Sequence, residues 1–248
     1  MTFQEKYHAY VNETLSAVWN DNQKEIEQAA HILYNAECGG HCIYTFGTGH
    51  SHMLGQDIYA RAGGFAKIKP IVEIELTLAT HPTKSTQIER LAGYADVLEQ
   101  LYHVKEGDVI IAASNSGRNA LVIEYLLRMK QKGARIVAIT SLCHSQKVKS
   151  RHESGKKLCD IADVVLDNKA PYGDAGIALN ETVSMGPVST LSGCFLSQYI
   201  VWQSCSSRIA ETSQSSAPAT PTAQMSITRS CLTDTSCNDK KSLSRTGK

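Results

Sequence analysis

Apolar residues recur at helical spacing through the first part of the chain. Over residues 4–36 they fall three or four positions apart, as Tyr7, Val11 and Leu15 do, which places them on one face of a helix. This spacing predicts one long or two short amphipathic helices. We therefore assign residues 1–36 to an N-terminal helical segment that packs on the rest of the protein.

Short apolar runs bounded by turn residues replace this pattern. They cover residues 42–46, 71–74, 109–113, 136–140 and 164–166. Most are separated by helix-like stretches such as residues 121–132, which end at Gly133. Continuous apolar runs are typical of parallel strands buried on both faces, and such strands need crossover helices. The pattern predicts an α/β fold, a three-layer αβα sandwich around a doubly wound five-stranded parallel sheet of the flavodoxin-like kind.

This predicted domain spans residues 37–203 and ends with a late helix over about residues 178–203, interrupted at Gly186-Pro187. The composition changes after it. Residues 204–248 are rich in Ser and Thr, contain no aromatic residue and show neither helical nor strand periodicity. We expect this segment to be a disordered tail.

Composition and charge exclude several classes of protein. The chain is 42% hydrophobic and 20% charged with a net charge of +1, which indicates neither general disorder nor a basic nucleic-acid-binding surface. We therefore expect no nucleic-acid partner. No apolar run reaches the roughly 18 residues of a membrane span, and the polar N-terminus lacks the apolar core of a signal peptide. We expect a cytoplasmic protein with no membrane partner.

Cysteine usage points to free thiols. The eight cysteines are irregularly spaced, which does not suggest a disulfide framework in a chain of 248 residues. Cys38 and Cys42 lack a second ligand pair at metal spacing, so we expect no metal site there. We also expect no cofactor.

A glycine-rich turn follows the first predicted strand. Its candidate phosphate-binding residues are Gly47, Thr48, Gly49 and Ser51. Such a turn exposes backbone N–H groups and a helix N-terminus to an anion. The G-x-G-x-x-G dinucleotide fingerprint is not met, because Gly55 is out of register. A nucleotide-binding α/β protein is therefore disfavoured.

A second polar turn follows the third predicted strand. Its candidate residues are Ser114, Asn115, Ser116, Gly117, Arg118 and Asn119. The serine hydroxyls, the turn at the glycine and the dipole of the following helix favour a phosphate ligand. The alternative is that Ser114, Ser116 and Asn119 only cap that helix.

These two turns resemble those of the sugar isomerase (SIS) domain family, which binds phosphorylated sugars. The resemblance covers roughly residues 30–203, and the chain is most similar to bacterial SIS-domain proteins of the UPF0309 type. It implies that the second turn holds the phosphate through Ser114 and Ser116, and that Ser51 reaches in from the first turn. The family motif ends in a hydroxyl residue where this chain has Asn119, which is a departure from the pattern.

The resemblance implies a sugar-phosphate isomerase or lyase, or alternatively a non-catalytic phosphosugar-binding or sensing module. It also implies a homodimer whose subunits share residues at each site. Isomerisation needs a base, and the position of the glutamate of sedoheptulose 7-phosphate isomerases is occupied here by Arg61. Our first candidate is Glu181 in the late helix, with His50 as the second. The alternative for Glu181 is a solvated carboxylate at a helix start.

Further polar residues lie near these segments. His52 lies beside His50 in the first turn and is a candidate for contact with the sugar. His81 and Glu89 lie between the second and third strands, where loops that cover ligands occur, but we expect them to be surface residues. Asp57, Arg61 and Glu73 are either site residues or members of internal ion pairs. Residues 172–176 contain two glycines and an aspartate, and they are either a cover over the site or an ordinary turn.

The resemblance also implies an Asn-x-Asp-Gly-x-Asp-Glu segment near the C-terminus. Suitable synonymous codons for residues 219–228 encode this segment when the reading frame begins one nucleotide earlier, so that each new codon takes the last base of one residue and the first two bases of the next. In that frame, the codon that begins with the last base of Gln224 encodes only Asp or Asn. We therefore hypothesise that the coding frame slipped near residue 204 and that the tail is not the ancestral C-terminus. The alternative is an ordinary low-complexity tail. Sequencing the gene should reveal third-position bases that spell the segment in the shifted frame. Incompatible bases in an intact frame would reject the hypothesis.

Overall fold

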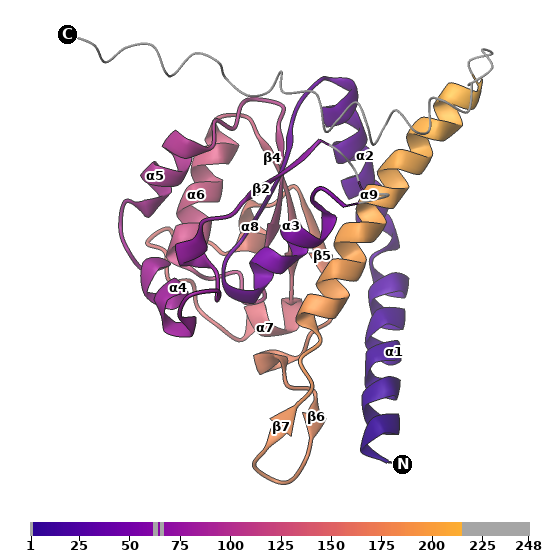
Figure 1. The fold of residues 1–248 in the computed structure, drawn as a ribbon, viewed down its shortest axis with the longest axis vertical. Helices are drawn as coiled ribbons and strands as arrows, with labels where there is room; N and C mark the ends of the chain where they lie inside the picture. Colours follow the sequence, from indigo (N-terminus) through magenta and orange to yellow (C-terminus); the bar gives the residue numbers. More distant parts are fainter. Residues whose placement is uncertain (1, 62–63, 65–66, 215–248) are drawn as a thin grey trace.

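A five-stranded parallel sheet lies at the centre of the computed structural model, which describes residues 2–61, 64 and 67–214 (Figure 1). The strands are β1 (Ile43–Gly47), β2 (Ile68–Ile71), β3 (Val109–Ala113), β4 (Arg135–Thr140) and β5 (Val164–Asp167). Their order in the sheet is β2-β1-β3-β4-β5. The chain therefore reverses its direction of travel across the sheet between β1 and β3, and the predicted doubly wound α/β fold is confirmed.

The prediction for β2 was displaced by three residues. We expected residues 71–74, whereas the strand covers Ile68–Ile71 and a 3₁₀ turn, η2 (Ile74–Leu76), follows it. β2 is an edge strand, and Lys69 and Pro70 within it are only half-buried. An edge strand tolerates a proline and needs no continuous apolar run, so a search for doubly buried strands does not find it.

Helices and short elements connect and cover the strands. The helices are α1 (Phe3–Asp21), α2 (Gln23–Cys38), α3 (His52–Ile58), α4 (Pro82–Ile88), α5 (Tyr94–Leu101), α6 (Ala120–Gln131), α7 (Leu142–Gln146), α8 (Leu158–Ile161) and α9 (Ser189–Gln214). The short elements are the 3₁₀ turns η1 (Gly49–Ser51) and η3 (Tyr172–Asp174) and a hairpin formed by β6 (Ile177–Ala178) and β7 (Ser184–Met185).

Two hydrophobic layers enclose the sheet. Alternate residues of β1 and β3, such as Ile43 and Val109, pack with α2, α3 and α9 on one face. The intervening residues, such as Tyr44 and Ile110, pack with α5, α6 and α8 on the other face. This alternation is the period of two that a strand buried on both faces imposes. Figure 1 shows α2 and α9 lying side by side over their face of the sheet.

One buried asparagine divides the N-terminal helical segment into α1 and α2. Asn22 is 2% exposed, and its Nδ2 donates to the carbonyl oxygens of Val18 at 2.8 Å and Asp167 at 3.0 Å. Its Oδ1 accepts the N–H of Asp167 at 2.8 Å. The junction of the two helices is thereby fixed to the end of β5. Of the two predicted alternatives, the structure has two shorter helices and not one long helix.

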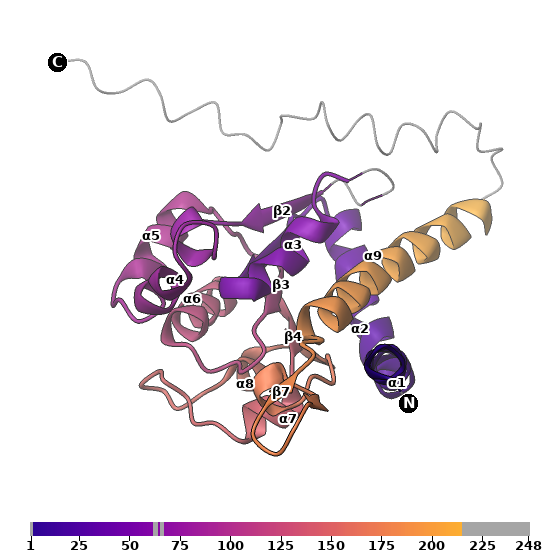
Figure 2. The same ribbon diagram turned by 60° about the horizontal axis from the view of Figure 1, so that its bottom comes forward.

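The late helix differs from the prediction at both ends. We expected a helix from residue 178, whereas the hairpin β6–β7 occupies that region and α9 begins at Ser189, directly after Gly186-Pro187. Asp174 caps the start of α9, because its Oδ1 accepts the N–H groups of Val188 and Ser189, each at 3.0 Å. Figure 2 shows α9 continuing beyond the sheet.

The expected boundary at residue 203 does not coincide with the end of this helix. α9 continues to Gln214, and Ser204 within it is 1% exposed. The disorder expected from residue 204 is therefore wrong for residues 204–214. The rest of the predicted tail, residues 215–248, lies outside the described residues, and so does the segment of the frame hypothesis.

The described helices and cysteines add two observations. None of these helices is both long enough and apolar enough to cross a bilayer. The cysteines within the described residues are all free, as the spacing predicted, whereas Cys231 and Cys237 lie outside them.

Candidate functional site

The two polar turns lie together at the carboxyl ends of the strands of the sheet. β1 and β3 pair in parallel, with Gly47 opposite Ala113, so the turns that leave these residues start side by side. They also stand at the point where the strand order reverses. Ligands of open α/β sheets bind in the crevice outside the carboxyl ends of the strands at such a point.

The first turn folds tightly back on the end of β1. A Cβ atom on Gly47 would lie 2.6 Å from the carbonyl oxygen of Ser51, so only glycine fits there. Gly49 has a φ of +56°, a conformation that glycine adopts without strain. Ser51 is half-buried, and its hydroxyl has no partner within the described residues. His50 is exposed, whereas His52 is buried against the carbonyl oxygen of Gly49.

The second turn supports both interpretations that the sequence left open. Ser114 is 6% exposed, and its hydroxyl accepts the N–H of Gly117 at 3.2 Å, which is a structural role within the turn. Asn119 occupies the N-cap position of α6, but its side chain does not cap the helix. The hydroxyl of Ser116 also has no partner within the part of the chain that the structure describes.

Several backbone donors of this turn are unused. Among the described residues, the N–H groups of Ser116, Arg118 and Asn119 meet no acceptor. They precede α6, a helix of 12 residues whose dipole places partial positive charge at the same point. Free N–H groups at a helix N-terminus form a binding site for an anion.

A small pocket joins the turns to two further segments. It is lined by Ser51, Leu54, Ala113, Ser114, Asn115, Ile139, Asn168, Ser189 and Thr190. The sequence prediction missed Asn168, Ser189 and Thr190. Asn168 directly follows β5, and its Nδ2 donates to the Oδ1 of Asn115 at 2.9 Å. Its position after a parallel strand was a usable signal, whereas the position of Ser189 depends on where α9 begins.

Glu89 is the most consequential residue that sequence reasoning undervalued. The structure buries it to 7% exposure, rather than leaving it on the surface. The Nδ2 of Asn119 in the second turn donates to its Oε2, and the side chain of Thr48 in the first turn lies close enough to lower the pKa of its carboxyl. Glu89 therefore bridges the two turns.

Burial raises the pKa of Glu89 above the ordinary value. The side chains of Thr48 and Asn119 and the nearby charges of Arg151 and Arg90 act in the opposite direction, but burial outweighs them. Glu89 thus lies beside the candidate ligand site as a carboxyl whose proton is released nearer to neutral pH.

Three arginines concentrate positive charge around the second turn. The Nη1 of Arg151 donates to the Oδ1 of Asn119 at 3.2 Å. Burial lowers the pKa of Arg151, and the neighbouring charges of Arg118 and Arg90 lower it further. Neither Arg118 nor Arg90 forms an ion pair with an acidic residue in the described ranges. This local excess of positive charge favours an anionic ligand.

The structure places the first-choice base away from these turns. Glu181 is exposed at the tip of the β6–β7 hairpin, rather than at a helix start, and it makes no hydrogen bond or ion pair with a described residue. The polar loop preceding that hairpin is held at Asp174, which caps α9, while Tyr172 packs against His144 with their ring centroids 4.9 Å apart.

Other candidates have structural partners. Asp57 pairs with Arg61, four residues further along the chain and beyond the end of α3, and accepts a hydrogen bond from Gln198 of α9 at 2.7 Å. The Oε1 of Glu73 accepts a hydrogen bond from the hydroxyl of Tyr102 at 2.8 Å. His81 is exposed and caps α4. The internal-contact or surface alternative therefore holds for these residues.

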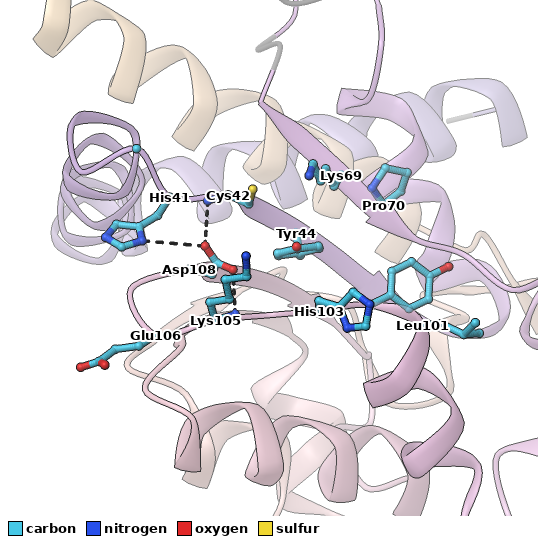
Figure 3. A pocket seen from close by; sticks show the side chains of 12 residues that line it. His41, Cys42, Tyr44, Lys69, Pro70, Leu101, His103, Lys105, Glu106 and Asp108 are labelled. Carbon is cyan, nitrogen blue, oxygen red and sulfur yellow. Dashed lines mark hydrogen bonds and ion pairs between the residues drawn. The ribbon is translucent and has the colours of Figure 1, made fainter. Parts of the chain in front are cut away.

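A second cleft lies at the amino ends of the strands, on the side opposite the turns. It has a volume of about 480 Å³ and is lined by residues that include His41, Lys69 and Lys105 (Figure 3). Its buried acidic group, Asp108, accepts the N–H groups of Cys42 and Lys105, each at 2.8 Å. Asp108 thus fastens the starts of β1 and β3, and its carboxylate is already occupied by backbone donors.

The fold and the two turns define an α/β protein with polar turns at the switch point of a parallel sheet. A model of the SIS domain family matches residues 6–141, more than half of the chain. The UPF0309 protein of Halalkalibacterium halodurans is 44% identical over 196 residues, covering 79% of this chain and 81% of that relative. The chain therefore belongs to the SIS domain family and, within it, to the UPF0309 proteins.

Solved structures share this fold. The phosphoheptose isomerase of Neisseria gonorrhoeae superposes with a TM-score of 0.53 at 18% identity, covering 83% of this chain and 100% of the isomerase. The NanR protein of Vibrio vulnificus, complexed with ManNAc-6P, superposes with a TM-score of 0.51 at 15% identity, covering 91% of this chain and 69% of NanR. At these identities the similarity establishes the fold.

The raised pKa of Glu89 predicts a pH-dependent gain in stability for Glu89→Gln. The folded chain holds this proton more tightly than the unfolded chain, so the wild type loses stability as pH rises from 4.5 through the raised pKa. Glutamine does not ionise. The free energy of unfolding of the variant relative to the wild type should therefore increase with pH over this window and then become constant. Urea unfolding of both proteins between about pH 5 and pH 8 measures it. A difference that is independent of pH would contradict the prediction.

Proposed function

We propose that this protein binds a phosphorylated sugar or amino sugar at the two turns and acts on it as a sugar-phosphate isomerase or lyase. The observation that carries the proposal is the set of unused donors at the start of α6. Three backbone N–H groups and the hydroxyl of Ser116 lie in one turn, and the hydroxyl of Ser51 belongs to the adjacent turn.

A phosphate suits these donors better than a neutral group. It offers several acceptor oxygens and two negative charges, and hydrogen bonds to a charged acceptor are about twice as strong as neutral ones. Arg118 and Arg151 add positive charge on the side of Asn119. The sugar would then extend from the phosphate along the carboxyl ends of β1 and β3, past Thr48 and Glu89.

Two structural neighbours support the same class of ligand. The neighbours described above are a phosphoheptose isomerase and a protein complexed with ManNAc-6P. The alternative is a phosphosugar-binding module without catalysis, which needs only the phosphate-binding turn. Catalysis additionally needs an acid–base group beside the sugar, and the burial of Glu89 between the turns favours the enzyme.

The phosphate-binding role of Ser116 predicts a specific loss of affinity. The wild type should gain thermal stability with hexose, heptose or N-acetylhexosamine phosphates but not with the corresponding free sugars. A ligand at about 100 times its Kd adds about 2.7 kcal/mol to the free energy of unfolding. Loss of one hydrogen bond to a charged group should raise the Kd of Ser116→Ala roughly 10- to 100-fold.

The matched control is Thr86→Ala, which removes an exposed hydroxyl from α4. It should bind like the wild type. Thermal unfolding over a range of ligand concentrations measures both variants. Equal stabilisation by a phosphosugar and its free sugar, or no stabilisation by any phosphosugar of the panel, would reject the proposed function.

We further propose that two copies associate through an aromatic face on α1 and α9 and complete each other's sites. The rings of Trp19 and Tyr199 meet edge to face with their centroids 4.9 Å apart, and the rings of Tyr199 and Trp202 are stacked with their centroids 6.1 Å apart. Trp19 and Trp202 are 41% and 62% exposed in the single chain. Large aromatic side chains are typical of the buried centres of interfaces, so a second copy packed on this face would cover them.

This association predicts a dimer in solution. Light scattering should give twice the chain mass of 27.0 kDa for the wild type. Trp202→Glu should shift the protein towards monomer, because a charge on an apolar interface is costly to bury. A wild type that is monomeric at micromolar concentrations would contradict the proposal.

A further inference from the structure

We propose that Glu89 is the acid–base residue that transfers the substrate proton. This inference rests on the proposed function and assigns its chemical step to a particular side chain. Glu89 directly follows α4, in the crossover between β2 and β3, and its side chain is turned inward to 7% exposure. The crossover thereby places the carboxyl of Glu89 near the carboxyl ends of β1 and β3, where both turns begin.

The contacts of Glu89 fix its carboxyl between the two turns. The amide of Asn119 donates to Oε2 from the second turn, and the side chain of Thr48 in the first turn lies close enough to act on the pKa of the carboxyl. Its own carbonyl oxygen accepts the N–H of Leu121 at 3.4 Å, which joins the end of α4 to α6. Backbone and side chain are both held, so the carboxyl has a defined position beside any sugar bound across the turns.

The surroundings suit proton transfer. A general base works best when its pKa is near the pH of operation, and burial of Glu89 moves the pKa in that direction. The charges of Arg151 and Arg90 act against burial, because they favour the ionised form and lower the pKa of Glu89. Among the candidate acids, Glu181 is exposed, Asp57 is paired with Arg61, and Glu73 is bonded to Tyr102.

The proposed step is balanced without an additional reactant. The Glu89 carboxylate takes a proton from the carbon next to the sugar carbonyl, and the electron pair of that C–H bond forms the carbon–carbon double bond of an enediol as the carbonyl oxygen gains a proton. Return of the proton from Glu89 to the neighbouring carbon, with loss of one hydroxyl proton, gives the isomeric carbonyl compound. A lyase reaction begins with the same proton abstraction.

Carbon-bound deuterium uptake tests this step directly. The full-length protein is incubated in D₂O with each phosphosugar that stabilises it, and the recovered sugar phosphate is analysed by mass spectrometry after its hydroxyl groups are returned to H₂O. We expect Glu89→Gln to slow uptake at least about 100-fold while it retains ligand-dependent stabilisation. The wild-type rate should rise with pH through the pKa of Glu89, and this dependence should be absent in the variant.

Glu106→Gln is the matched control, because this carboxylate is exposed at the opposite end of the sheet. It should exchange within threefold of the wild type. Glu181→Gln tests the residue that the sequence favoured. If Glu181→Gln loses exchange, or if Glu89→Gln exchanges within threefold of the wild type, the assignment of Glu89 is wrong while the proposed function stands.

The remaining outcomes separate the two proposals. Stabilisation of the wild type by a phosphosugar without any deuterium uptake would overturn the role of Glu89 and favour a binding module. Absence of stabilisation by every phosphosugar would overturn the proposed function itself, and this inference with it.

Discussion

The parallel pairing of β1 with β3 is the constraint on which the candidate site depends. The chain leaves β1 towards α3 on one face of the sheet and leaves β3 towards α6 on the other face. Two connections that diverge from adjacent strands cannot fill the space between them with regular structure. The polar turns that begin after Gly47 and Ala113 border this space, and their unused hydroxyl and N–H groups lie at its rim.

Maintaining that geometry requires close packing behind the turns. A Cβ atom on Gly55 would lie 2.1 Å from the Oγ1 of Thr45, so α3 rests directly on β1. On the other side, a Cβ atom on Gly117 would lie 3.1 Å from the Cβ of Leu158, and Gly117 has a φ of +62°. The glycines at these two places therefore let α3 and the second turn pack closely on neighbouring residues, which restricts the directions of the donors in both turns.

The sequence predicted those parts of the fold that local patterns determine. β1, β3 and β4 are buried on both faces, so their apolar runs were recognisable, and the turns follow directly from them. β2 was displaced because an edge strand obeys a weaker pattern. The start of α9 was misplaced because it is set by Asp174, whose carboxylate reaches Val188 and Ser189 across 14 and 15 residues.

Glu89 shows why the site was harder to predict than the fold. Its importance comes from burial and from an amide 30 residues away, at Asn119, which no local spacing reveals. The departure from the family motif at Asn119 was itself a signal. A hydroxyl has its donor and acceptor on one atom, whereas an amide separates them and can bridge two groups. Asn119 does so here, since it donates to Glu89 and accepts from Arg151.

This bridge couples phosphate binding to the basicity of Glu89 in the proposed mechanism. In the free protein, Arg151 lowers the pKa of Glu89 and so partly offsets the effect of burial. A phosphate bound in the second turn adds negative charge beside Arg151, which weakens the stabilisation that this arginine gives to the ionised carboxyl. The pKa of Glu89 therefore rises further when the phosphate is in place. The carboxylate becomes the stronger base in the complex that contains a substrate, and a free sugar without a phosphate would not produce this change.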